Sequence, residues 1–208
     1  MPLLKQKRYM PNTLYSIAIF TIVATITPGP ATTLASTSGV NFGYRRSLPL
    51  IFGIGLGLGT LSFLAAIGLV RLLLEVPALH LALKIMGSSY LLWLSWKIAS
   101  SGPPGDLAGN QDDPYSLVTG AMLLWLNPKG WAMALSAAAA FSGFSNKPYA
   151  LAFVLGSAFV LAALFSLSIW CFVGVLLRKV LRTEKQWRIV NSTLGLLLVS
   201  SIVPIWLS

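Results

Sequence analysis

Six apolar segments, separated by short polar stretches, dominate this sequence. A helix needs about 20 mainly apolar residues to cross the hydrocarbon core of a bilayer. The pattern therefore predicts an all-α membrane protein with six transmembrane helices. These spans are expected over residues 14–34, 48–70, 78–98, 115–141, 149–177 and 189–207.

The composition agrees with a membrane protein. The chain is 56% hydrophobic and 10% charged, whereas soluble domains are about a quarter charged. Its net charge of +10 comes from basic residues that lie mostly between apolar segments. Those residues indicate orientation in a lipid membrane rather than a nucleic-acid partner. Cys171 and His80 each stand alone, which excludes an internal disulfide and a zinc site of several cysteines or histidines. No metal and no cofactor is expected.

The basic residues also predict which loops face the cytoplasm. One side of the membrane would carry Arg45, Arg46, Lys97, Arg178, Lys179, Arg182, Lys185 and Arg188. The other would carry Arg71, Lys84 and Lys147, joined by the N-terminal residues Lys5, Lys7 and Arg8. The positive-inside rule then places the loops after spans one, three and five in the cytoplasm and both termini outside. The basic tail opposes this orientation, and a translation start at Met10, which would remove residues 1–9, is one explanation.

The longest polar stretch, SSGPPGDLAGNQDDPY at residues 100–115, divides a single transporter domain (residues 1–208) into two halves. The halves cover about residues 10–100 and 115–208. Each half has a span interrupted by proline: Pro28 and Pro30 in span one, Pro128 in span four. Matching interruptions are typical of transporters built from internal repeats. With three spans in each half, the second repeat would be inverted.

The first interruption reads TITPGPATTLAS. Pro28 and Pro30 lack N–H donors, and Gly29 permits backbone angles that other residues avoid. We expect an unwound helix with freed carbonyl groups around residues 24–26, which must be buried in protein or face water. Hydroxyl groups that could satisfy some of them lie on Thr25, Thr27, Thr32 and Thr33.

The second interruption reads LLWLNPKGWAM, and Asn127, Pro128 and Lys129 are its candidate residues. Freed N–H groups and a lysine suit a carboxylate, whereas freed carbonyls and hydroxyls suit an ammonium group. A zwitterionic amino acid presents both groups, and the paired interruptions predict a binding or gating site for one. Two alternatives stay open: the threonines could only bond within their own helix, and Lys129 could be a snorkelling anchor.

Other motifs support no enzyme. GIGLGLG at residues 53–59 lies within a span, and its glycine spacing favours helix packing over nucleotide binding. All acidic residues fall in loops or at span edges, so neither an intramembrane aspartyl protease nor a carboxylate proton relay is visible. A membrane-embedded enzyme and a helper subunit without a solute path are the two rival functions.

Three segments resemble the LysE/RhtB family of amino-acid exporters. They are TPGPATTLASTSGVNFGYRRS, LKIMGSSYLLWLSWKIA and LLWLNPKGW, in that order. WLSWKIAS and RIVNSTLGLLLV look closest to the branch of cysteine/O-acetylserine exporters. The resemblance implies a multi-pass protein of the bacterial inner membrane that exports amino acids or related metabolites by alternating access, driven by the proton gradient. It assigns motif roles to Thr27, Pro28, Gly29, Pro30, Asn127, Pro128 and Lys129.

One departure from the family pattern stands out. Family members commonly carry Asn-Asn directly after PGP, where this chain has Ala31 and Thr32. If those amides contact the substrate, the specificity of this chain is altered. The lack of a carboxylate within the spans leaves proton coupling unassigned. A homodimer formed through the glycine-rich second span and the aromatic span ends is a further expectation.

Overall fold

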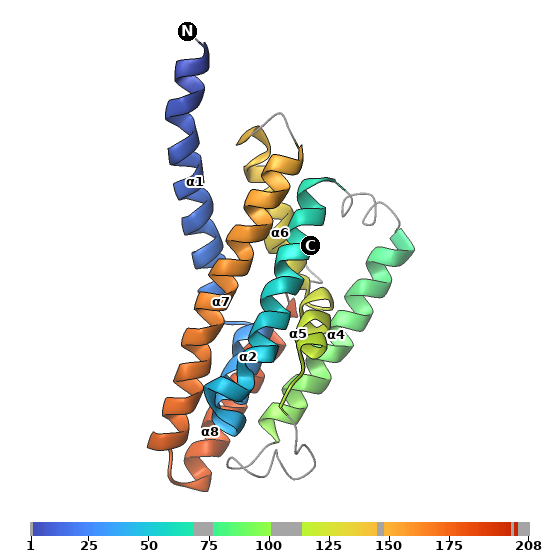
Figure 1. Cartoon of the computed structure of the whole chain (residues 1–208). Coiled ribbons are helices and arrows are strands. Elements are labelled where there is room, and N and C mark those ends of the chain that lie inside the picture. Colours follow the sequence, from blue (N-terminus) through green and yellow to red (C-terminus); the bar gives the residue numbers. More distant parts are fainter. Residues whose placement is uncertain (1, 69–76, 101–113, 145–147, 201, 204–208) are drawn as a thin grey trace.

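The computed structural model describes residues 2–68, 77–100, 114–144, 148–200 and 202–203. Over these residues the chain is helical and contains no strand, which confirms the all-α prediction. The helices form an elongated bundle (Figure 1). In chain order they are α1 (Pro2–Ile26), α2 (Pro30–Ala66), α4 (Pro77–Ala99), α5 (Leu117–Trp125), α6 (Pro128–Ala140), the 3-10 helix η2 (Ser142–Phe144), α7 (Pro148–Val180) and α8 (Glu184–Ser200).

Both predicted interruptions are confirmed. Helix α1 ends at Ile26 and α2 begins at Pro30, which leaves residues 27–29 as the first break. Helix α5 ends at Trp125 and α6 begins at Pro128, which leaves residues 126–127 as the second break. Proline is favoured in the first turn of a helix because the N–H it lacks would have no partner there. Each break therefore ends where a proline restarts the helix.

Helix α2 reverses direction at Gly43. The hydroxyl oxygens of Ser38 and Ser47 lie 2.7 Å apart, although nine residues of straight helix would rise about 14 Å. Gly43 has a φ of +75°, which glycine adopts readily and other residues rarely do. Helix α2 thus has a first limb (residues 30–42) and a second limb (residues 44–66). The sequence predicted a loop between residues 34 and 48, and this prediction is wrong. The residues on both sides of Gly43 are helical, and the chain turns at that single glycine.

Contacts with α7 establish the directions of the two limbs. Those of α1 and the first limb advance along α7 in chain order: Thr25 with Ser166, Ser36 with Trp170, and Val40 with Arg178. Those of the second limb run the opposite way: Tyr44 with Ser168, and Phe63 with Phe153. Helix α7 is therefore parallel to α1 and the first limb, and antiparallel to the second limb.

The glycines of the second limb serve packing, as expected. A methyl group on Gly53 would overlap the carbonyl oxygen of Leu117 in α5, and one on Gly59 would overlap the Val160 side chain in α7. Small residues at such positions let helix backbones approach closely. Helices α5 and α7 of the same chain cover these glycines. The glycines are therefore not available for the expected homodimer contact.

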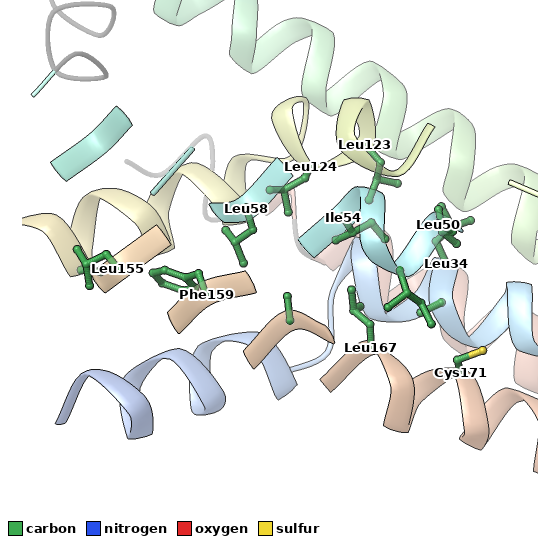
Figure 2. Packing of buried hydrophobic residues seen from close by; sticks show 14 of the residues in the cluster. Leu34, Leu50, Ile54, Leu58, Leu123, Leu124, Leu155, Phe159, Leu167 and Cys171 are labelled. Atoms are coloured by element: carbon green, nitrogen blue, oxygen red, sulfur yellow. The ribbon is translucent and has the colours of Figure 1, made fainter. Parts of the chain in front are cut away.

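The core lies where both limbs of α2 meet α5 and α7. Leu34, Leu50, Ile54, Leu123 and Leu167 pack there and are at most 2% exposed (Figure 2). This core holds the segments on either side of both breaks in fixed positions.

Large apolar side chains also cover the outside of the bundle. On α7, Phe153, Leu161 and Leu176 are 67%, 68% and 58% exposed. By length and composition, two helical segments among the described residues could cross a membrane: Tyr149–Val180, and Pro30–Ala66 through its second limb. Asn12–Ile26 is a shorter apolar helix. Exposed apolar surface of this extent suits contact with lipid.

Candidate functional site

A cavity lies between the two breaks and joins them. It encloses about 350 Å³, counting the space at its mouth, and is lined by residues of α1, both limbs of α2, α5, α6 and α7. Six of the nine residues predicted from the sequence line it: Thr27, Gly29, Pro30, Thr32, Asn127 and Lys129. The two breaks, about a hundred residues apart in sequence, therefore meet at one place. The three predicted residues outside this lining are Pro28, Thr33 and Pro128.

Two side chains of α7 donate hydrogen bonds to carbonyls at the end of α1. The Ser166 hydroxyl donates to the Thr25 carbonyl at 2.8 Å, and the Trp170 indole N–H donates to the Ile26 carbonyl at 3.0 Å. Ser166 and Trp170 are four residues apart and so lie on one face of the helix. The predicted freeing of carbonyls near residues 24–26 is confirmed at these two positions, and partners from another helix satisfy both.

Lys129 links the second break to the first. Its ammonium nitrogen donates to the Thr27 carbonyl at 2.6 Å and to the Pro28 carbonyl at 3.4 Å. Neither sequence interpretation of Lys129, as a carboxylate ligand or as an interfacial anchor, included this contact. A charged donor on a carbonyl is a strong hydrogen bond. The lysine therefore ties α6 to the unwound segment that follows α1.

Gly29 provides space for a neighbouring side chain, and its backbone angles do not require glycine. Its φ of 176° is extended backbone that any residue adopts, so the expected conformational reason is wrong. A methyl group at Gly29 would instead lie 3.2 Å from Cδ and 3.4 Å from Nζ of Lys129. The glycine thus makes room for the lysine side chain beside the first break.

The threonine hydroxyls bond locally. Those of Thr25 and Thr27 donate to carbonyls one turn earlier in α1, at Thr21 (2.8 Å) and Val23 (2.6 Å). The alternative that threonines bond only within their own helix is confirmed for Thr27. The Thr25 hydroxyl also lies 3.3 Å from the Ala162 carbonyl of α7. The Thr32 hydroxyl differs, because it accepts the Gly29 N–H and donates to the Gly29 carbonyl, both at 2.8 Å.

Thr33 lies at the start of the first limb. Its backbone N–H donates to the Gly29 carbonyl at 2.9 Å, and the residue is 3% exposed. It therefore helps to begin the helix that follows the first break.

Asn127 caps α6. Its side-chain oxygen accepts the backbone N–H of Lys129 at 3.1 Å, and Pro128 occupies the first helical position. The residue is 2% exposed, so the cap is sealed inside the protein. At the second break, neighbouring residues in the sequence therefore satisfy the start of α6. The same turn places Lys129 against the first break.

Comparison with known proteins identifies the family of the chain. The family model described as LysE type translocator matches residues 22–201, a range that contains both breaks. The chain belongs to the LysE translocator family. It is similar to the cysteine/O-acetylserine efflux proteins of Escherichia coli strain K12 and Shigella sonnei strain Ss046, at 32% identity each. Each alignment covers 94% of this chain and 98% of the relative. No solved structure matches.

Family membership confirms the resemblance and favours transport over the rival enzyme. The structure also gives the two residues after PGP a location. Ala31 and Thr32 both line the cavity. A change of side chain at these positions therefore alters the cavity wall directly.

Several residues of the site were missed in the sequence. Ser166 and Trp170 were not recognised, although a serine and a tryptophan four residues apart within an apolar span are a signal for polar contacts. Met133 and Leu58 line the cavity but carry no signal, because apolar residues are common in every span.

An aromatic group lies on one side of the cavity, toward the start of α1. The Phe20 ring packs edge-on against Phe141 and Phe159, with ring centroids 5.8 and 6.4 Å apart. Phe20 lies about one turn before the cavity residues Ala24 and Thr25. The translocator thus has a second contact between α1 and the α6 region, at the opposite end of α6 from Lys129.

Proposed function

We propose that this translocator exports a small amino acid, or a related metabolite, across the bacterial inner membrane. The observation that carries the proposal is the meeting of the two proline breaks at one cavity, linked by Lys129. The names of the relatives make cysteine and O-acetylserine the first candidate substrates. The nine predicted residues, including Pro28, Thr33 and Pro128 outside the lining, would act in binding or gating.

The cavity has groups for both ends of an amino acid. Lys129 offers an ammonium group to a carboxylate. The Thr27 carbonyl, with the Pro28 carbonyl just outside the lining, offers acceptors to an ammonium group. Ile54, Leu58 and Met133 provide an apolar wall for a side chain.

Helix pairing supports two inverted three-span halves within one domain of residues 1–208. Span one, formed by α1 and the first limb of α2, is parallel to α7, which is span five. Span four is parallel to span two, since Gly53 faces Leu117 and Gly57 faces Ala121. Exchange of the halves at residues 10–100 and 115–208 converts the first pair into the second, as a repeat requires.

The basic residues support a cytoplasmic end. The Arg178 guanidinium lies 3.4 Å from the Val40 carbonyl and 3.5 Å from the Asn41 carbonyl. The reversal in α2 and the end of α7 therefore lie at one end of the bundle, the lower end in Figure 1. Arg45 and Arg46 directly follow that reversal. We assign this end to the cytoplasm and the start of α1 to the outside.

Alternating access would open the cavity to one end at a time. An outward path requires α1 to separate from α6, because the Phe20–Phe141 contact and the lysine link both join them. The resemblance implies that the proton gradient drives export, and Lys129 is the ionisable side chain among the lining residues. For a homodimer, the exposed Trp93 and Trp96 of α4 remain as the proposed face.

Counterflow in proteoliposomes tests the proposal. The purified chain is reconstituted with a panel of unlabelled amino acids inside, and uptake of each labelled amino acid is measured at varied external pH. We expect transient accumulation of cysteine or O-acetylserine, absent from protein-free vesicles, with a rate that depends on pH. Absence of counterflow with every amino acid would contradict the proposal, and product formation by the chain in detergent would favour the enzyme.

A further inference from the structure

The Lys129 side chain brings a primary ammonium group to acceptors that would also suit a substrate ammonium. Its Nζ atom lies 2.6 Å from the Thr27 carbonyl oxygen, within the lining of the cavity. The Pro28 carbonyl oxygen is the second acceptor, at 3.4 Å. Both acceptors belong to the unwound first break and therefore lie outside any helical ladder.

We propose that Lys129 is a built-in occupant of the substrate's ammonium site and that an amino acid binds by exchange. The substrate ammonium takes the Thr27 and Pro28 carbonyls, and the displaced Lys129 ammonium pairs with the substrate carboxylate. The Lys129 ammonium therefore has hydrogen-bond acceptors both before and after the exchange. This inference rests on the proposed amino-acid function and adds the order of contacts within its site.

The physical reason is the cost of unpaired groups away from water. The Thr27 and Pro28 carbonyls have no helical partner because the helix is interrupted there, and inside a membrane protein they need a donor. Lys129 supplies it while the cavity is empty. An amine without a carboxylate would displace the lysine and leave its charge without a partner. A carboxylate without an amine offers the lysine a partner but leaves the carbonyls without a donor. Only a zwitterion satisfies both sides.

Exchange would also remove one link between the halves. The same hydrogen bond holds the first break against α6, so its loss leaves the Phe20–Phe141 pair, at the other end of α6, between α1 and that region. Gly29 lets the lysine side chain lie against the backbone without obstruction. While the cavity is empty, the first break would thus stay bonded to Lys129 of α6. A bound zwitterion would break that bond.

Three related ligands test the exchange by direct binding to the purified full-length chain in lipid nanodiscs under reducing conditions. Cysteine has both charged groups, cysteamine lacks the carboxylate, and 3-mercaptopropionate lacks the amine. For the wild type we expect cysteine to bind at least about tenfold more tightly than either analogue, the range for a lost charged hydrogen bond. Calorimetry gives the three dissociation constants.

The decisive variant is Lys129→Met, with Lys129→Arg as the matched control. Lys129→Met leaves the carbonyls of Thr27 and Pro28 without a donor, so cysteamine should bind about tenfold more tightly than it binds to the wild type. Cysteine and 3-mercaptopropionate should bind more weakly, because their carboxylate loses its partner. Lys129→Arg keeps a cation at the carbonyls and should leave cysteamine binding weak.

Cysteamine binding to Lys129→Met that is unchanged or weaker, in protein that elutes as the wild type does, would overturn the exchange. An equal loss for all three ligands would indicate a structural role only and would overturn it too. If the methionine variant does not elute normally, Lys129→Leu, whose side chain also lacks a donor, provides the same comparison. Absence of cysteine counterflow in the wild type is a separate result, which contradicts the substrate assignment and leaves the cysteamine comparison decisive for the exchange.

Discussion

Both breaks leave backbone polar groups without helical partners, and these groups are satisfied differently at the two places. The second break covers residues 126–127 and is closed by its own sequence, because Asn127 caps α6 and Pro128 begins it. The first break covers residues 27–29, and donors from α6 and α7 occupy the carbonyls that it and the end of α1 present. A break that depends on partners from elsewhere can be changed by moving or replacing a partner. We therefore regard the first break as the responsive region and the second as its rigid partner.

The largest effect is expected from removing the first break. Pro28→Ala combined with Pro30→Ala restores two N–H donors, so span one should straighten and export should be abolished while the protein stays in the membrane. Counterflow and membrane fractionation measure the two outcomes. Pro49→Ala is the matched control, because Pro49 lies on the exposed side of the second limb of α2. Normal export by the double variant would remove the first break from the mechanism.

The next largest effect is expected from the link between the breaks. Lys129→Met removes the donor to the Thr27 and Pro28 carbonyls and should lower export at least about tenfold. Lys129→Arg keeps the charge and should retain more export than the methionine variant. Initial rates of counterflow at several substrate concentrations measure both. Equal activity of the wild type and both variants would restore the interfacial-anchor interpretation.

A smaller effect is expected from removing a single hydrogen bond between helices, compared with one inside a helix. Ser166→Ala removes the donor to the buried Thr25 carbonyl and should cost about 1–3 kcal/mol of stability, with reduced export. Ser157→Ala is its control on the same helix, because that exposed hydroxyl bonds only within α7. Thermal unfolding in detergent compares the two. Equal midpoints for Ser166→Ala and Ser157→Ala would show that the first break does not need its partner.

The smallest effect is expected at Gly29. Because its φ is 176°, Gly29→Ala introduces no backbone strain and only moves the Lys129 side chain by a few tenths of an ångström. Export should fall less than about threefold, and stability should not change measurably. Gly43→Ala provides the contrast, since a φ of +75° should cost about 1–2 kcal/mol. A larger loss of stability at Gly29 than at Gly43 would contradict the spatial explanation.

The sequence predicted those features that depend on local chemistry. Prolines remove donors wherever they stand, so both breaks and the restart of each helix at a proline could be placed from Pro28, Pro30 and Pro128. The close glycine packing of the second limb also followed from spacing alone. The turn at Gly43 could not be predicted from spacing. The flanking residues are helical on both sides, and the backbone leaves helical angles at one residue only.

Partners distant in sequence could not be predicted. Lys129 contacts a carbonyl 102 residues away, and Ser166 one that is 141 residues away. Backbone carbonyls are present at every residue and carry no signal in a sequence. The correct reason for Gly29 depends on that same lysine contact, so it too required the three-dimensional arrangement.

The central claim is that both breaks line one substrate site, and thiol labelling tests it most directly. Ala31→Cys and Met133→Cys place a thiol on either side of the cavity, next to the first break and on α6. The wild type controls for Cys171, which is buried. We predict that O-acetyl-L-serine protects both thiols from a small methanethiosulfonate reagent with the same half-maximal concentration. Protection of one thiol alone, or of neither, would contradict the account.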